Sequence, residues 1–366
     1  MLGEEQSYLW VIAKDTNYVC TLPAEKEIIR RVEPYLAMLE QPPRPGISPA
    51  DMGKNLFDLL IPPAVWKRSR ANWIIIPDGV LCYLPFETLI SRLENGAPQY
   101  LIESCSLSYA HSASVLAQIR KQKAPAKREG KRELLAFGDP WFGEAENAAS
   151  TRRSSNTPDS ATAPVDEREL YVERGFELRR LPYSAVEVES IAKFFPKTHA
   201  TIYLRVEATE ERAKAELRRR YQFIHFATHG VVDDTLPGRS SIVLTLDRDP
   251  AEDGFLQMNE IFNLSLDAEL VALSACQTGR GKFVGGEGFL GLTRAFLYAG
   301  AKSLLVSLWP VNDQSTARLM AAFYSYLRAG KTQAGALQSA KIDFIRGEPA
   351  ATRHPYYWAP FVLIGN

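Results

Sequence analysis

The chain has 366 residues, of which 46% are hydrophobic, and this is enough to bury one large core or two ordinary ones. Its 43 basic and 43 acidic side chains give a formal net charge of zero. Proteins that bind nucleic acid usually carry a basic excess, because contacts to phosphate supply most of their affinity. The composition therefore argues against nucleic acid as a direct partner.

The N-terminal residues 1–5 lack the basic and apolar segments of a secretory signal, and no apolar run approaches the roughly 20 residues that cross a bilayer. We therefore expect a soluble, cytoplasmic protein without membrane contact. The cysteines are far apart and form no CxxC pair: Cys20, Cys82, Cys105 and Cys276. This spacing favours free thiols in a reducing compartment over a disulfide framework or a zinc site.

Strands and helices are predicted from the N-terminus onward. Residues 7–20 carry β-formers on both sides of the turn cluster 15–17, which predicts two short strands. Apolar spacing predicts a helix over 25–39, ended by a Pro-rich stretch. Residues 73–79 form an apolar run before a turn signal, typical of a buried strand, and 112–122 are predicted to be helical.

The middle of the chain changes in composition. Residues 121–132 are rich in Lys and Arg, which favours a solvated linker over a contact with an acidic partner. Residues 134–140 are predicted to form another buried strand. Residues 144–169 contain hardly any large apolar side chain, so we expect a long mobile loop. Self-cleavage at Arg152-Arg153 in that loop is a further hypothesis, because nicking concentrates in mobile segments.

From residue 184 onward, strands alternate with helices, and this order predicts a mostly parallel α/β sheet with helices on both faces. The predicted helices cover 184–195, 209–220, 288–298, 315–328 and 332–344. The predicted strands cover 201–204, 223–228, 242–245, 270–274, 303–308 and 359–364.

Two of these strands end near a reactive side chain. The strand at 223–228 is followed by His229 and Gly230, and the strand at 270–274 by Cys276. Ligands collect at the carboxyl ends of parallel strands, so His229 and Cys276 would face each other if the two strands are neighbours. An imidazole can stabilise a thiolate and later protonate a leaving amine, while the backbone N–H groups of Gly230 and Cys276 could form an oxyanion hole.

The other histidines and cysteines fit structural roles. His225 lies in the middle of its strand between apolar neighbours, which favours a buried, hydrogen-bonded histidine over a catalytic base. His111, His199 and His354 lie in ordinary contexts. Strand position therefore selects His229. The cysteines Cys20, Cys82 and Cys105 are expected to have structural roles, which leaves Cys276 as the candidate nucleophile.

At these residues the chain resembles the CHAT domain, a bacterial caspase- and separase-like cysteine peptidase. The matching stretches are His225-Phe226-Ala227-Thr228-His229-Gly230, Leu273-Ser274-Ala275-Cys276-Gln277-Thr278-Gly279, Gly285-Gly286-Glu287-Gly288 and Leu305 to Asp313, with Ile76 to Phe86 upstream and Tyr357 to Phe361 at the end. The resemblance implies a Cys–His dyad, His229 and Cys276, that cuts peptide bonds without a metal or another cofactor.

The resemblance also implies an organisation. Residues 1–125 would be a degenerate caspase-like subdomain, and 126–366 the caspase-like peptidase domain. Relatives usually carry tetratricopeptide repeats before this domain. Such repeats are absent from this sequence, so we expect a fragment of a longer protein, regulated by a repeat region or by an activator protein.

Substrate recognition has two open interpretations. In separases, which the chain resembles here, the aspartate matching Asp313 receives an arginine before the scissile bond; a helix cap is the alternative role for Asp313. Asp233 and Asp234 follow His229 and could orient the imidazole or bind substrate, although a polar turn is favoured by composition. Glu287, in the Gly-rich segment, is expected to shape the region after the nucleophile.

The leading functional interpretation is a cysteine endopeptidase that cleaves partner proteins, with a basic residue before the cut as one hypothesis. The alternative is a signalling or scaffold module whose dyad is silent or conditional. A thiol amidase acting on small molecules is less favoured, because the sequence has no lid or cofactor motif that would close a small pocket.

Overall fold

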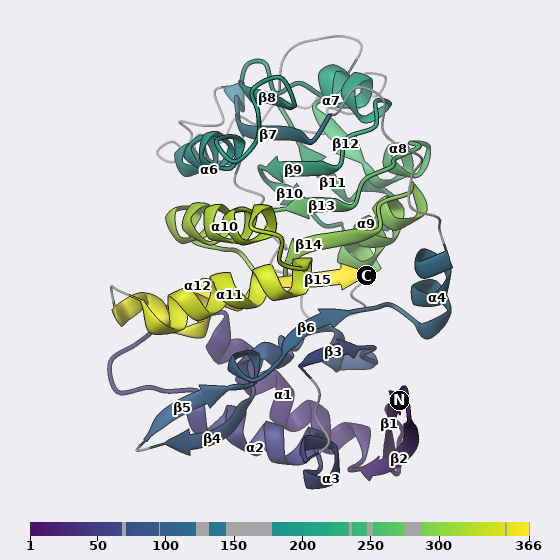
Figure 1. Ribbon diagram of the computed structural model, residues 1–366, viewed down its shortest axis with the longest axis vertical. Coiled ribbons are helices and arrows are strands. Elements are labelled where there is room, and N and C mark those ends of the chain that lie inside the picture. Colours follow the sequence, from purple (N-terminus) through teal and green to yellow (C-terminus); the bar gives the residue numbers. More distant parts are fainter. Residues whose placement is uncertain are drawn as a thin grey trace, which may run out of the picture. The chain divides into compact units, whose positions relative to one another are not determined.

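The computed structural model describes residues 1–67, 71–94, 96–121, 132–143, 178–233, 236–246, 252–274, 287–347 and 350–365, with the side chains of 287–290 excepted. These residues belong to two compact units, one made of 1–126 with 302–366 and the other of 127–301. Both units are mixed α/β structures (Figure 1).

The main sheet strands of the first unit follow the order β3, β6, β15, β14. Their bounds are β3 (Asn72–Ile75), β6 (Ser106–Tyr109), β15 (Phe361–Gly365) and β14 (Ser303–Ser307). β3, β6 and β15 run parallel, and β14 runs antiparallel to β15. Two hairpins accompany this sheet: β1 (Ser7–Ala13) with β2 (Thr16–Leu22), and β4 (Ile90–Glu94) with β5 (Ala97–Tyr100).

Helices of the first unit come from both ends of the chain. They are α1 (Glu25–Leu39), α2 (Ala50–Leu60), α3 (Pro63–Trp66), α4 (Ala113–Lys121), α10 (Asp313–Arg328), α11 (Gln333–Arg346) and α12 (Pro355–Trp358). α11 packs against β6 and β15 (Figure 1). It carries a fully buried ammonium, Lys341, which pairs with the equally buried Glu87 at 3.2 Å. Tyr109 of β6 donates a hydrogen bond to the same carboxylate, so this core contains a satisfied polar network.

The second unit is built on four parallel strands in the order β13, β9, β7, β8. Their bounds are β13 (Leu270–Leu273), β9 (Phe223–Ala227), β7 (Leu134–Pro140) and β8 (Ala200–Arg205). A small antiparallel sheet follows β9: β10 (Gly230–Val231), β11 (Ser241–Val243) and β12 (Phe255–Gln257). The helices are α6 (Pro182–Ala192), α7 (Glu210–Leu217), α8 (Met258–Phe262) and α9 (Glu287–Tyr298).

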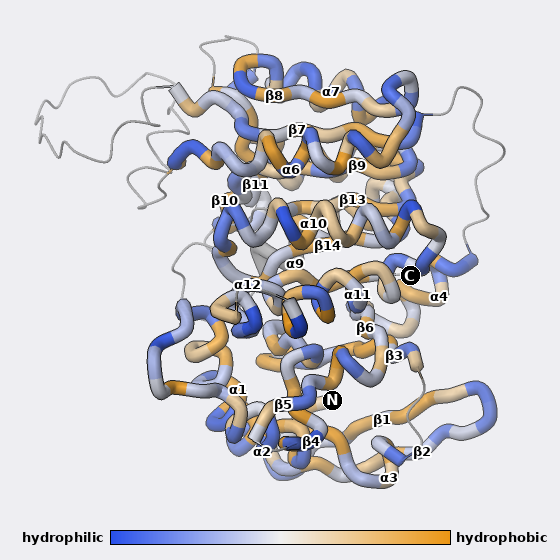
Figure 2. The backbone as a smooth tube through the Cα atoms, turned by 60° about the vertical axis from the view of Figure 1, so that its left-hand side comes forward, coloured by the Kyte–Doolittle hydropathy of each residue, from blue (hydrophilic) through white to orange (hydrophobic). Residues whose placement is uncertain are grey.

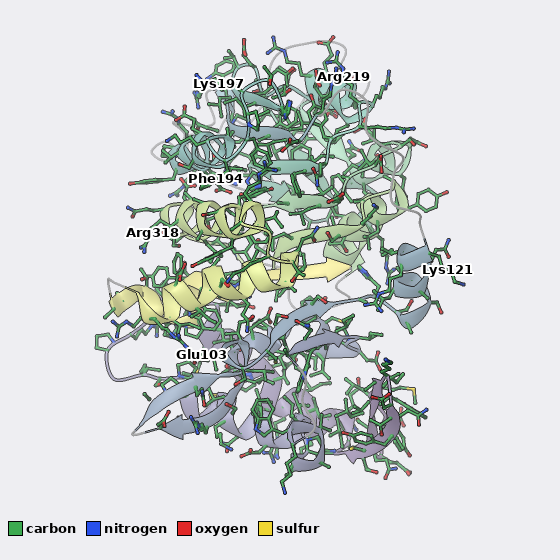
Figure 3. All side chains as sticks on the ribbon, in the orientation of Figure 1. Glu103, Lys121, Phe194, Lys197, Arg219 and Arg318 are labelled. Carbon is green, nitrogen blue, oxygen red and sulfur yellow. The ribbon has the colours of Figure 1, made fainter. Side chains whose placement is uncertain are left out.

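Alternation along β9 shows that helices cover both faces of this sheet. His225 contacts Glu187 of α6, whereas the next residue, Phe226, lies 6.2 Å from the ring of Phe296 on α9. Successive strand residues point to opposite faces, so α6 and α9 lie on opposite sides. Figure 2 shows apolar and polar residues alternating along α6, as expected for a helix with one face on a sheet. Charged side chains such as Lys197 and Arg219 are exposed at the periphery of the unit (Figure 3).

The prediction of a mostly parallel α/β structure with helices on both faces of a sheet is confirmed in the second unit. Among the described residues, no helix is long and apolar enough to cross a membrane. The division at residue 125 stays a prediction. The proposed mobile loop at 144–169, including Arg152-Arg153, and most of the basic segment 121–132 lie outside the described residues.

Two predicted strands have different surroundings from those expected. The segment 73–79 was expected to be buried, but β3 is an edge strand, with Ile74 39% exposed and Ile76 beyond it 45% exposed. The segment 242–245 corresponds to β11, which joins the small antiparallel sheet rather than the parallel one. An apolar run alone does not tell an edge strand from a central one, because both can cover a core with one face.

Candidate functional site

The two strands that carry the candidate dyad are neighbours, which is the condition on which the sequence interpretation depended. β9 and β13 run parallel, with Phe226 opposite Leu273, and the N–H of Ser274 donates to the carbonyl of Phe226 at 2.9 Å. Both carboxyl ends therefore reach the same edge of the sheet. Ser274 is the last described residue on the β13 side, and Cys276 lies outside the described residues.

His229 follows β9 by two residues and is 1% exposed. Its Nε2 lies 2.6 Å from the carbonyl oxygen of Arg179. A carbonyl can only accept, so Nε2 carries the proton and Nδ1 holds the lone pair of the neutral ring. Among the described residues, Nδ1 is buried and has no hydrogen-bond partner. The imidazole thus presents an open proton acceptor.

Burial is the main influence on the charge of this imidazole. It lowers the pKa of His229 below its usual value of 6.5, because the charged ring would lose its hydration, and the Arg179 carbonyl offsets part of this effect. The ring of Phe142 lies 5.2 Å from the imidazole, centroid to centroid, and is itself fully buried. The neutral form, which can accept a proton, is therefore favoured.

His225 has the structural role that its mid-strand position indicated. Its Nε2 lies 2.7 Å from Oε1 of Glu187, and both side chains are almost completely buried. The bond joins the middle of β9 to α6, on the face of the sheet rather than at its carboxyl edge. His225 is therefore a buried, hydrogen-bonded histidine that fastens α6 to the strand leading to His229.

The residues directly after His229 begin the small antiparallel sheet. Gly230 begins β10 and is paired with Ile242. Asp233 is 4% exposed; its Oδ1 accepts from the N–H of Leu236 at 2.9 Å, and its own N–H donates to Ser240 Oγ at 3.1 Å. These bonds fit the polar turn that composition favoured. Asp234 lies outside the described residues, and the oxyanion hole from Gly230 and Cys276 stays a prediction.

The candidate substrate residues Asp313 and Glu287 both begin helices. Asp313 is the first residue of α10 and is half-buried. The capping residue is its neighbour Asn312, whose side chain accepts from the N–H of Ser315 at 3.0 Å. The capping role considered for Asp313 therefore belongs to Asn312, one position earlier. Glu287 begins α9, but its side chain lies outside the described part of the chain.

Two neighbours of the imidazole were missed by sequence reasoning. Arg179 acts through its carbonyl, which every residue has, so no sequence signal could have identified it. Phe142 follows the segment Gly138-Asp139-Pro140 at the end of β7, and its place just beyond a strand end was the available signal.

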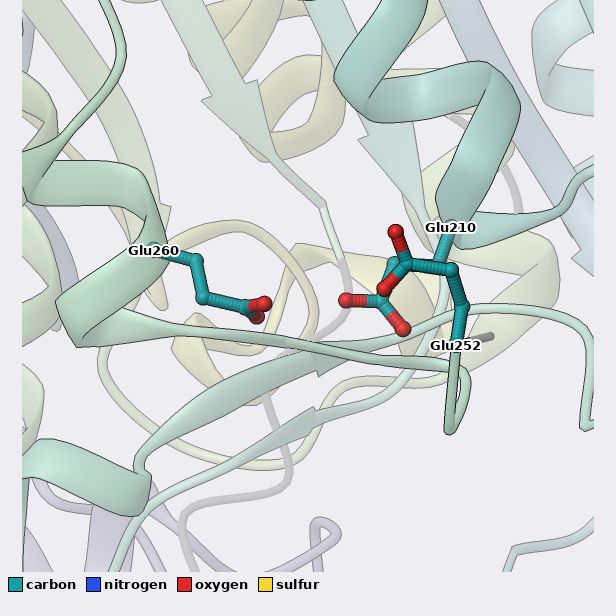
Figure 4. Close-up of side chains that lie close together, drawn as sticks. All are labelled: Glu210, Glu252 and Glu260. Carbon is teal, nitrogen blue, oxygen red and sulfur yellow. The ribbon is translucent and has the colours of Figure 1, made fainter. Parts of the chain in front are cut away.

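A cluster of carboxylates lies on the β12 side of the same unit. Ligand atoms of Glu210, Glu252 and Glu260 lie within 4.8 Å of one another (Figure 4). The ammonium of Lys214 sits among them, at 2.8, 2.5 and 2.6 Å respectively. Burial and the nearby Glu260 raise the pKa of Glu210 to about 7 although Lys214 opposes the shift. Lys214 supplies the cation of this cluster, which is an ion-pair network.

Comparisons with known proteins identify related sequences and folds. A family model described as the CHAT domain matches residues 50–366. Tetratricopeptide repeat protein 28 of Homo sapiens is 38% identical over 136 residues, covering 37% of this chain and 5% of that protein. The Mus musculus protein of the same name is 38% identical over 117 residues, covering 32% and 5%. The chain thus spans about a twentieth of the length of these relatives.

Among solved structures, the chain is similar to the Arg-specific cysteine proteinase gingipain R, with a TM-score of 0.42 and 8% identity over 72% of this chain and 54% of that one. It is also similar to the Saccharomyces cerevisiae separase–securin complex, with a TM-score of 0.45 and 13% identity over 80% of this chain and 15% of that one.

Proposed function

The chain belongs to the CHAT domain family, and from this premise we propose that it is a cysteine endopeptidase with Cys276 as nucleophile and His229 as general acid/base. The observation that carries the proposal is the state of His229. Its Nε2 is held by a carbonyl, and its Nδ1 has no partner among the described residues although it is buried. A buried acceptor without a partner is costly unless a donor reaches it. A thiol of the dyad would be such a donor.

The strand register supports Cys276 as that donor. Every pair between β13 and β9 joins residues 47 apart in number, and the same difference separates His229 from Cys276. A chain that continued in register would bring both residues to the same level beyond the sheet. Among the described cysteines, Cys105 is a poorer candidate, because burial raises the pKa of its thiol to about 12.

The proposed reaction needs only these groups and water. Nδ1 of His229 takes the thiol proton, and the sulfur attacks the peptide carbonyl carbon to form a tetrahedral oxyanion. The backbone N–H groups of Gly230 and Cys276 would stabilise that oxyanion, at about 3 kcal/mol per donor. The imidazolium then gives its proton to the leaving amine. Water, deprotonated by the same imidazole, hydrolyses the thioester and restores the thiol.

Substrate choice is the finer part of the proposal. We take a partner protein as the substrate, with a basic residue before the scissile bond as the finer hypothesis; Asp313 is the residue that the likeness to separases would assign to that basic side chain. Asp233 is a weaker candidate for substrate binding, because its carboxylate already accepts from the turn. Glu287 would border the nucleophile's segment at the start of α9.

The second candidate function is a signalling or scaffold module with a conditional dyad. It is favoured by the names of the curated relatives, which are tetratricopeptide repeat proteins. The segment that matches this chain is only 5% of the length of each of them. A repeat region or an activator protein would then be the partner that switches the dyad on. Both candidates predict a protein partner, but only the peptidase predicts cleavage by the chain alone.

A peptide library with a basic or an apolar residue before each bond tests the peptidase. The unmodified chain should cleave, Cys276→Ala and His229→Gln should not, and Cys20→Ser, on the β1–β2 hairpin, should cleave as the unmodified chain does. Equal cleavage by Cys276→Ala would overturn the proposal. No cleavage by any version, with a reactive Cys276, would favour the conditional module.

A further inference from the structure

We propose that Asp139 is a positioning residue for His229: it holds residues 178–181 through Arg180, and this segment supplies the carbonyl that orients the imidazole. The catalytic consequence rests on the proposed function, whereas the orientation of the ring does not. Asp139, Arg180, His229 and the residues between them in the contact chain all belong to the described part of the second unit.

Asp139 occupies the carboxyl edge of the sheet, next to the strand that leads to His229. It lies near the end of β7, which pairs with β9, and it is 1% exposed. Its φ of 45° is in the left-handed region, which is uncommon for a residue with a side chain, although Asp and Asn tolerate it best. The register between β7 and β8 shifts between Gly138 and Pro140, and the strained backbone of Asp139 indicates that local contacts hold it in this conformation.

Two arginines of the same unit surround the Asp139 carboxylate. Arg180 donates from Nε at 3.1 Å and from Nη2 at 2.8 Å, which is a bidentate contact, and Arg205 donates from Nη1 at 3.2 Å. Side-chain exposure is 2% for Asp139 but 49% for Arg180. The carboxylate is therefore the fixed end of the pair. Losing these donors would leave a buried carboxylate without a partner, at a large cost in free energy. The contact with Asp139 therefore keeps the Arg180 side chain in place.

The backbone of Asp139 adds a second link to the same segment. Its N–H donates to Ser184 Oγ at 2.7 Å, and that hydroxyl donates to the carbonyl of Leu181 at 2.7 Å. Side chain and backbone of Asp139 thus hold Arg180 and Leu181, on one side of Arg179. On the other side, Leu178 is buried in the apolar cluster that contains Phe142. The carbonyl of Arg179 is fixed from both directions.

The segment after Asp139 reaches the imidazole directly. The ring of Phe142, three residues on, lies 5.2 Å from the imidazole of His229, centroid to centroid, with the two ring planes at 46°. The extension of β7 therefore limits the ring in two ways: Phe142 restricts its tilt, and Asp139, through Arg180, fixes the acceptor of its Nε2–H. With Nε2 protonated, the lone pair stays on Nδ1, the atom that the proposed chemistry requires.

The variant Asp139→Asn separates positioning from simple stability. Asn keeps the shape, one oxygen acceptor and the tolerance of left-handed φ, but loses the charge that binds both guanidiniums. The matched control is Glu216→Gln, which neutralises another buried carboxylate of this unit, paired with Arg219 at 2.9 Å. Glu216 lies on α7 and is bonded to Tyr221 and Tyr203 rather than to the segment 178–181.

The first measurement is the tautomer of His229 by nitrogen-15 NMR of histidine-labelled protein, with His229→Gln to assign the signal among five histidines. The neutral ring should carry its proton on Nε2 in the unmodified chain and in Glu216→Gln, and should become a mixture of tautomers in Asp139→Asn. An unchanged Nε2–H tautomer in folded Asp139→Asn would overturn the proposal. Arg180→Gln, at a half-exposed position, gives the same test should Asp139→Asn fail to fold.

The second measurement is turnover of a cleaved peptide. Asp139→Asn should lower kcat about tenfold or more with little change in KM, because misplacing a catalytic group by about 1 Å can cost about 100-fold. Arg180→Lys keeps the positive charge but cannot make the bidentate contact with Asp139. Its kcat should lie between those of the unmodified chain and Asp139→Asn. If the unmodified chain cleaves nothing, the proposed function fails while the tautomer still decides this inference. If it cleaves and Asp139→Asn changes neither tautomer nor kcat, the inference fails while the function stands.

Discussion

Gly138→Ala is the substitution for which the structure gives the most definite expectation. Gly138 lies in β7, one residue before Asp139, and a Cβ placed there would come 2.7 Å from Cγ2 of Val188 and 2.8 Å from the carbonyl oxygen of Ser184. Both atoms belong to α6. Carbon atoms pack comfortably at about 3.5–4.0 Å, so the helix start would have to retreat by about 1 Å.

The Ser184 carbonyl is backbone and cannot rotate away, so the clash must move the chain itself. Overpacking of this kind costs about 1–3 kcal/mol of unfolding free energy. The displaced residues are those that hold Arg179, so the Nε2 bond of His229 should weaken together with the stability of α6. The backbone of Gly138 is not in the left-handed region, which leaves the clash as the cause.

Hydrogen exchange of α6 and β7 measures this local cost without requiring the two units to unfold together. The matched control is Gly238→Ala, since Gly238 also has an ordinary φ and nothing lies within 4 Å of its Cβ position. Gly238→Ala should stay within about 0.5 kcal/mol of the unmodified chain. Equal protection of α6 in both variants, with full peptide cleavage by Gly138→Ala, would refute this account of the strand end.

Three further predictions concern buried charges. Lys341→Met leaves Glu87 buried without its cation and should lower unfolding free energy by about 3–5 kcal/mol, measured by denaturant titration. The pKa of Glu210 is raised to about 7 from its usual 4.5. Its contribution to the unfolding free energy is therefore full below about pH 4.5 and is lost as the pH rises through 7. Glu210→Gln should flatten this decline of the unfolding free energy with pH. Because the pKa of His229 is lowered, its contribution to the unfolding free energy is full above pH 6.5 and is lost as the pH falls below that value. An NMR titration of His229 should give a midpoint under pH 6.5.

Each of these has a clear contrary result. Replacing both Lys341 and Glu87 by apolar residues should recover most of the loss, and no recovery would mean that the pair was not its cause. An unchanged slope of stability with pH in Glu210→Gln would assign the decline to another group. A midpoint above 6.5 for His229 would show that a negative charge, rather than burial, dominates its surroundings.

Periodicity and strand order predicted the framework of the second unit. The apolar runs at 134–140, 223–228 and 270–274 correspond to β7, β9 and β13, whose complete burial is visible as mostly apolar sequence, with His225 and Asp139 as the polar exceptions. These strands depend on local composition, which a single sequence contains. The pairing of β9 with β13 was only a condition of the sequence interpretation, and it is the structure that shows it.

Contacts between distant backbone atoms could not be predicted in the same way. The carbonyl of Arg179 and the bonds of Asp139 depend on how the chain returns after residues 144–177, and no local pattern specifies that return. Burial of β3 was overestimated, because the apolar run at 73–79 does not record that β3 is an edge strand. The capping role, one of two open interpretations of Asp313, belongs to Asn312, and the sequence could not separate these residues because both are good caps.

The central claim is that His229 activates Cys276, and covalent labelling tests it most directly. Intact protein is treated with a peptide electrophile that carries arginine or an apolar residue, and the modified cysteine is located by mass spectrometry. Rapid labelling at Cys276, at least about tenfold slower in His229→Gln and unchanged in Cys20→Ser, is the predicted result. Labelling of Cys276 at equal rates with and without His229 would contradict the dyad.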